Sequence, residues 1–191
     1  MADSNIEIKA LGEANLANNN NGDITPQKMR ETFGAMLNHL GGNVYLVNSS
    51  TTPQVISANT PTILQNDGLG SLSVTAYRPH YLNATTFLAG NLLHLNDLIN
   101  STIVSMRFEC EFDVPANTNV KLTAIFRDAT ATEAFRLQFE EVYYKSAAVH
   151  KLTSNFQFFM DNNITNGTME LVYESDTNSS AILKSIMADI R

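Results

Sequence analysis

An alternation of apolar and polar side chains over residues 104–114 constrains the fold of this chain more than any other feature. Every second residue from Val104 to Val114 is apolar, and the residues between them are polar or charged. Successive side chains of a β-strand point to opposite faces of the sheet, so the pattern predicts a strand with one buried and one wet face. About eight to ten such strands after Val44 are typical of an antiparallel sandwich or barrel.

The strand predicted at 104–114 is followed by Pro115 and by a second alternating segment at 120–127. These two segments are expected to pair as a hairpin. The final segment is ambiguous, because its isoleucines lie four residues apart and would also suit a helix; the surrounding strands favour a strand. Further strands are expected at 43–47, 61–64, 71–77, 85–88, 135–140, 150–160, 168–174 and 181–190.

The composition agrees with a β-protein rich in loops. Only 16 % of the residues are charged, while the chain has 22 Asn and 18 Thr, which favour turns and polar strand faces. Lysine and arginine number 12 against 19 acidic residues, and no basic cluster exceeds two residues. We therefore expect no nucleic-acid partner.

The chain has no apolar run long enough for a membrane span, and its N-terminus is too polar for a secretory signal. We expect neither membrane insertion nor export by the ordinary route. Cys110 is the only cysteine, which excludes a disulfide within the chain and fits synthesis in a reducing cytosol. It lies on the apolar side of its strand, so we expect a buried, unreactive thiol.

Residues 1–24 are expected to form a flexible attachment arm. Four consecutive asparagines and a glycine interrupt this segment, which cannot bury enough apolar surface to fold alone. Two isoleucines alternate with charged residues, so part of the arm could add as a strand to a partner's sheet; plain disorder is the other interpretation. The candidate apolar anchors to the particle are Ile6, Ile8, Leu11 and Leu16.

Residues 25–42 are predicted to contain an amphipathic helix, and residues 43–191 the β-domain. Thr25 is a good N-cap, Pro26 suits the first helical position, and Gly41 and Gly42 would end the helix. Its apolar stripe either covers one end of the β-domain or forms a short bundle around an oligomer axis. The residues at the bundle positions are Met29, Phe33, Met36 and Leu40.

No residue pattern supports an enzyme, a cofactor or a metal site. The four histidines lie far apart, and the chain has neither a nucleophile elbow nor a phosphate-binding loop. Glu109, Glu111 and Asp113 form a row that could suggest a glycosidase pair or a cation site. A solvated face neutralised by Arg107 and by a cross-strand Lys121 or Arg127 is the favoured interpretation.

Several stretches resemble the small jelly-roll domains of tailed-bacteriophage virions, which are similar in form to tumour-necrosis-factor or C1q heads. The features that carry the resemblance are a turn, the entry into a long strand, a hairpin and a short Tyr-Lys segment. They lie at Asn66–Gly68, Asp97–Arg107, Pro115–Leu122 and Tyr144–Ala147. The helix-forming segment also resembles the helices that precede such domains.

The resemblance implies a jelly-roll capsid decoration or head-fibre protein. Such a protein would be made in the bacterial host cytoplasm, form a homotrimer and be anchored to the major capsid protein or another virion protein through its N-terminal region. Several strands also have apolar residues on the face opposite their main apolar face, and these residues should be buried between the subunits of a trimer. This second apolar set consists of Ile125, Val142, Phe159 and Val172. The alternative is a tail-associated fibre or adaptor whose sandwich binds a receptor or a host-surface glycan. The missing secretory signal disfavours a signalling ligand.

Overall fold

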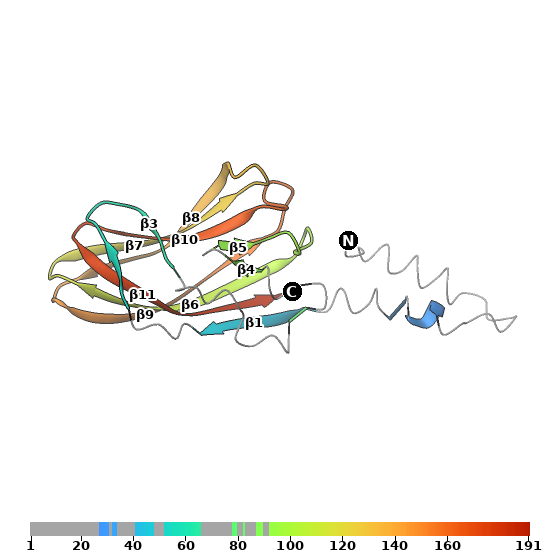
Figure 1. Cartoon of the computed structure of the whole chain (residues 1–191), viewed down its shortest axis with the longest axis horizontal. Helices are drawn as coiled ribbons and strands as arrows, with labels where there is room; N and C mark the ends of the chain where they lie inside the picture. Colours follow the sequence, from blue (N-terminus) through green and yellow to red (C-terminus); the bar gives the residue numbers. More distant parts are fainter. Residues whose placement is uncertain are drawn as a thin grey trace, which may run out of the picture.

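The computed structural model describes residues 27–30, 32–33, 41–47, 52–65, 78–79, 82, 87–89 and 92–191. Two antiparallel sheets pack face to face as a sandwich, and the helical residues 27–30 and 32–33 lie outside it (Figure 1). The chain is therefore mainly β with one short helix, as the alternation of side chains predicted.

Eleven strands make up the described part of the sandwich. They are β1 (Gly42–Val47), β2 (Gln54–Ile56), β3 (Thr62–Ile63), β4 (Leu88–Ala89), β5 (Leu92–His94), β6 (Ile103–Val114), β7 (Thr118–Arg127), β8 (Glu133–Tyr144), β9 (Ala148–Phe159), β10 (Thr168–Ser175) and β11 (Ser179–Ile190). We call the sheet with the order β1-β11-β6-β9 sheet A, and the sheet with the order β4-β5-β10-β7-β8 sheet B. β2 pairs with β11, and β3 pairs with β10.

The strand pairs are nested in the sequence. β7 pairs with β8, β6 with β9, β5 with β10 and β1 with β11, so each pair encloses the one before it. The successive pairs belong alternately to sheet B and sheet A. A long hairpin wound around a shared core in this way is a jelly roll, which confirms the expected fold.

The expected hairpin between the strands at 104–114 and 120–127 is wrong. β6 lies in sheet A, where β9 and β11 occupy its two edges, while β7 lies in sheet B. Asn117 adopts a left-handed conformation with a φ of 61°, and the Thr118 hydroxyl donates to the Pro115 carbonyl at 2.8 Å. The connection therefore crosses between the sheets, and both apolar faces point into one core.

Other predictions have mixed outcomes. The final segment is a strand, since β11 pairs with both β6 and β1. The helical residues agree with the predicted helix, although Gly42 already belongs to β1. Some predicted features lie outside the described residues: the arm 1–24 with Ile6, Ile8, Leu11 and Leu16, the helix positions Met36 and Leu40, and the strand at 71–77.

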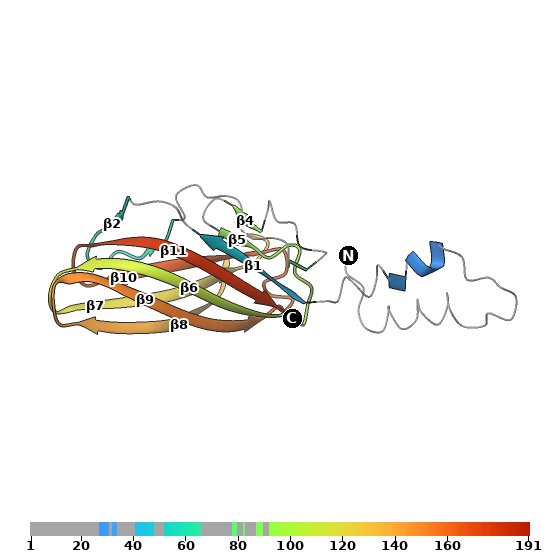
Figure 2. The same cartoon turned by 90° about the horizontal axis from the view of Figure 1, so that it is seen from below.

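Aromatic side chains fill the core between the two sheets. The ring of Phe108 meets that of Phe139 edge-on with centroids 5.0 Å apart, and Phe139 stacks on Phe156 at 4.7 Å. Phe126 stacks on Phe135 at 4.4 Å. The two contacts of Phe139 join β8 of sheet B to strands of sheet A, whereas the Phe126–Phe135 contact lies within sheet B. The contacts of Phe139 therefore hold the sheets together where β8 and β9 lie along one side of the sandwich (Figure 2).

A β-bulge in β8 changes which of its side chains face the core. The pairing with β7 shifts between Leu122 and Thr123, so Phe139 and Glu140 both point inward. Val142 then lies opposite Val120 on the inner face, whereas the sequence pattern placed it on the outer one. Simple alternation fails beyond this point, because a bulge inserts one extra residue into the strand.

The second apolar set is smaller than expected. Ile125 and Val172 lie on the outer side of sheet B but are only 9 % and 7 % exposed within the single chain. Phe159, by contrast, is 64 % exposed at the end of β9. Of the four residues that favoured a trimer, only Phe159 presents a large apolar surface, so these residues favour a trimer less than the sequence pattern indicated.

Replacement of Phe108 by alanine tests the assignment of the two faces of β6. Phe108 is 1 % exposed, so Phe108→Ala should lower the free energy of unfolding by about 3–5 kcal/mol. Glu109→Ala, on the opposite face of the same strand, should stay within about 0.5 kcal/mol. Urea denaturation of both variants measures the difference. Equal losses would show that the assigned faces are wrong.

Candidate interaction surfaces

The described residues hold no group of three or more His, Cys, Asp and Glu side chains that could bind a metal. His94 and His150 lie in different sheets, and His39 and His80 fall outside the described residues. Cys110 is 1 % exposed, as predicted, and burial, together with nearby Glu109, raises the pKa of its thiol. The thiol therefore stays protonated and is a poor nucleophile.

The carboxylate row of β6 lies on the outer face of sheet A and is largely neutralised. Arg107 contacts Glu109 at 3.1 Å. Lys151 Nζ lies 3.4 Å from one carboxylate oxygen of Glu111, and Lys184 Nζ lies 3.8 Å from the other. These lysines come from the flanking strands β9 and β11. The expected partners Lys121 and Arg127 are wrong, because both lie in sheet B.

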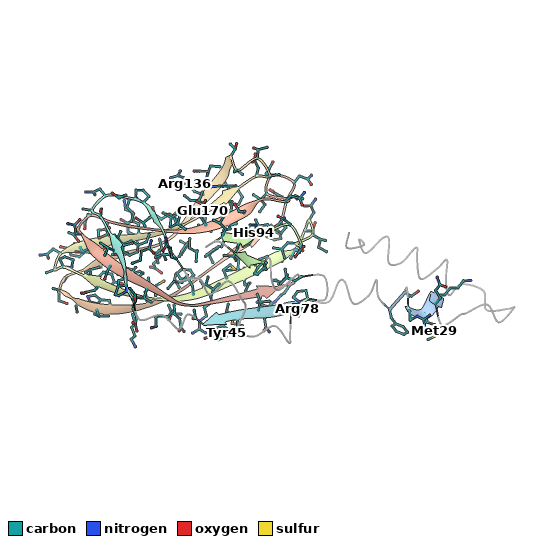
Figure 3. The ribbon with its side chains drawn as sticks, in the orientation of Figure 1. Met29, Tyr45, Arg78, His94, Arg136 and Glu170 are labelled. Atoms are coloured by element: carbon teal, nitrogen blue, oxygen red, sulfur yellow. The ribbon has the colours of Figure 1, made fainter. Side chains whose placement is uncertain are left out.

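A hollow of about 300 Å³ opens on the same face of sheet A. Met187 of β11 lies opposite Tyr45 of β1 on one side and opposite Arg107 of β6 on the other. These three side chains therefore form one row across the sheet. In the neighbouring row the small Ser185 lies opposite Glu109, which leaves room above it. Tyr45 is labelled on β1 in Figure 3. An aromatic ring beside an Arg–Glu pair can contact a small polar ring such as a sugar.

The outer side of sheet B carries a partly buried ion pair. Arg127 Nε lies 2.8 Å from Glu170 Oε1, and Nη2 donates to Oε2 at 3.1 Å. The hydrogen bond from Arg127 to Glu170 raises the pKa of the guanidinium. Glu170 of β10 is labelled in Figure 3, as is Arg136 of β8, and β7 lies between these two strands. Because the pair is bidentate and joins neighbouring strands β7 and β10, its role is to hold sheet B together.

The seam between β8 and β9, where the two sheets end side by side, is only half covered. Ser154 of β9 donates to the Glu140 carboxylate of β8 at 2.8 Å. The ring of Tyr144 stacks on His150 with centroids 4.1 Å apart. Burial raises the pKa of the Tyr144 hydroxyl, which has no hydrogen-bond partner among the described residues. The half-buried apolar side chains of this seam are Leu137, Phe139, Tyr144 and Leu152.

The predicted helix positions that the structure describes are exposed. Met29, which is labelled in Figure 3, is 44 % exposed, and Phe33 is 56 % exposed, so neither side chain is buried against the sandwich. The chain enters the sandwich at Gly41, where a Cβ atom would clash with the carbonyl of Ile190. The helical residues therefore connect to the end of the sandwich where the C-terminus also lies (Figure 1).

Sequence reasoning identified the carboxylate row and the helix stripe but missed two of these surfaces. The hollow depends on the register of β1 and β11, which join residues far apart in the sequence. The seam depends on the two strands left at the edges of their sheets. Among the residues that the structure describes, no helix is long and apolar enough to cross a membrane.

No protein-family model and no curated protein matches this sequence. The chain is similar in structure to murine APRIL, with 12 % identity, 80 % of this chain and 99 % of that chain covered, and a TM-score of 0.47. Eiger TNF from S. frugiperda has 10 % identity, 79 % and 92 % coverage, and a TM-score of 0.43. A chain in the structure of the infectious bursal disease virus Gt strain has 10 % identity and a TM-score of 0.45. That match covers 80 % of this chain and 33 % of the viral chain.

Proposed function

We propose that this chain is a structural protein of a bacteriophage virion, a homotrimeric capsid decoration or head-fibre protein. The jelly roll forms the body of the trimer. The N-terminal region attaches it to the major capsid protein or another virion protein. The resemblance of the features from Val44 to Arg191 to virion jelly rolls supports this proposal, and so does the nested jelly-roll pairing of the described strands.

The exposure of Met29 and Phe33, the two described residues of the helix stripe, is the observation that carries the proposal. Met29 and Phe33 lie one helical turn apart, so both are on one face of the helix, and both are exposed in the single chain. A helix with an uncovered apolar face is stabilised when copies of it pack together. Three such helices at one end of three sandwiches would form a short bundle and direct three arms toward the particle.

Charge substitutions in the helix test the bundle. Met29→Glu with Phe33→Glu should shift full-length protein from a multiple of three chains toward smaller species, because the substitutions would bury charge in the bundle. Arg30→Glu changes an exposed neighbour outside the stripe and is the control. Light scattering at micromolar concentration measures the mass. A mass of one 21.0 kDa chain for the unsubstituted protein would contradict the trimer.

Deletion of residues 1–24 tests the attachment arm. These residues precede the sandwich and its core, so the thermal unfolding midpoint should change little. Incorporation into virions should be abolished, since three arms in one trimer increase avidity together. Quantitative protein analysis of purified particles measures the incorporation. Normal occupancy of the truncated protein would show that the helix or the sandwich makes the attachment.

The hollow on sheet A favours a second candidate, a tail-associated fibre or adaptor that binds a host-surface glycan. Tyr45 offers a ring for stacking, and Arg107 and Glu109 offer charged hydrogen-bonding groups. A glycan array probed with the full-length protein should then show binding that Tyr45→Ala abolishes. Lys121→Ala, on the other sheet, is the control. No binding to any glycan favours the capsid role.

A further inference from the structure

Among the residues that the structure describes, no strand pairs with the outer edge of β9. Met160, just after β9, exchanges backbone hydrogen bonds of 2.9 Å with Thr102 and Ser101, on the side of β6. Backbone groups of alternate residues point to the same side of a strand. The N–H and C=O groups of even-numbered residues therefore point to β6. Those of the odd-numbered residues point away from the sheet: 149, 151, 153, 155, 157 and 159.

This edge lacks the features that normally protect an edge strand. The pairing of β9 with β6 is continuous from Ala148 to Phe159, without a bulge. The segment has no proline, and Lys151 is its only Lys, Arg, Asp or Glu. β8, the edge strand of sheet B, instead has two register shifts and several charged residues. Bulges and charges prevent strand addition, so β9 is open to another strand and β8 is not.

The outward side chains of β9 are symmetric about Ser154. Val149 and Phe159 are 62 % and 64 % exposed, and each lies five residues from this centre. Between them lie Lys151, Thr153, Asn155 and Gln157, which are polar and also exposed. Read in either direction, the outward side chains are therefore one apolar residue, four polar residues and one apolar residue.

We propose that β9 pairs antiparallel with β9 of a second copy of this chain, across a two-fold axis at Ser154. Val149 of each copy then lies opposite Phe159 of the other, and Lys151 lies opposite Gln157. No like charges face each other across the axis. The odd-numbered backbone groups of both strands find partners, and the two copies of sheet A become one continuous sheet.

The backbone geometry limits the choice of register. Only odd-numbered residues have outward backbone groups, so an odd residue must pair with an odd one. A two-fold axis at Thr153 satisfies this rule, but it places Val149 opposite Gln157 and leaves Phe159 beyond the last pair. A shift to Ser154 matches apolar with apolar at both ends, which is the pairing that stabilises cross-strand neighbours. The axis therefore lies at Ser154.

This contact is independent of the proposed trimer, because it uses β9 rather than the helix. If the protein is a trimer, β9 pairing across two-fold axes joins two trimers into an assembly of six chains. If it is not a trimer, the same pairing joins two chains. Light scattering of the full-length protein therefore separates the two proposals. A mass of six chains supports both, and a mass of two supports only the β9 pairing. A mass of three or one overturns the β9 pairing.

Charge substitutions at the paired positions test the register. Val149→Glu alone and Phe159→Lys alone should each weaken the pairing about tenfold, because each replaces both apolar cross-strand contacts of the two-fold interface with a contact between a charged and an apolar side chain. The double variant should restore it, since the introduced lysine of each copy would face the introduced glutamate of the other. Val55→Lys is the control, as Val55 is 80 % exposed on β2 of the same sheet. Circular dichroism checks that every variant is folded.

Two results would overturn the pairing. If the single variants keep the mass of two or six chains in light scattering, β9 does not form the contact. A double variant that stays as weak as the single variants would show that Val149 and Phe159 do not face each other. Deletion of residues 1–24 should leave the pairing intact; its loss would mean that the arm, rather than a second β9, occupies the edge.

Discussion

The pairing of β6 along both of its edges determines how the rest of the sandwich is arranged. β9 occupies one edge and β11 the other, so β7 must cross to the second sheet, where it pairs with β8 and β10. The inner face of β6 contributes Phe108 and Phe112, which contact aromatic rings of sheet B. Because β8 and β9 then end their sheets on the same side, the half-covered seam and the unpaired edge of β9 follow from this one arrangement of the described strands.

The sequence predicted which face of each strand is buried better than it predicted which strands pair with each other. Alternation showed that Phe108 and Cys110 are buried and that Glu109 and Glu111 are not, because side-chain direction is a local property. Alternation carries no information about which edge meets which strand, and the β6–β7 hairpin was wrong for this reason. The bulge of β8 moved Val142 inward, since one extra residue reverses the pattern without any local signal in the sequence.

The candidate surfaces differ in how far sequence could predict them. The charged face of β6 was expected, but Lys151 and Lys184 replaced the expected partners because β9 and β11 are its neighbours. The hollow near Tyr45 needs the register of three strands that are distant in the chain. The open edge of β9 left one signal in the sequence, a long alternating segment with a single lysine, but only the sheet order shows that it is an edge.

In the proposed assembly, copies of this chain associate through the apolar side chains of Met29 and Phe33, which the single chain leaves exposed. A cryo-electron microscopy map of the purified full-length protein tests it most directly. The account predicts three sandwiches around a three-fold axis, with Met29 and Phe33 of the three chains in contact on that axis. A map in which the helix packs against its own sandwich, with no three-fold axis, would contradict it.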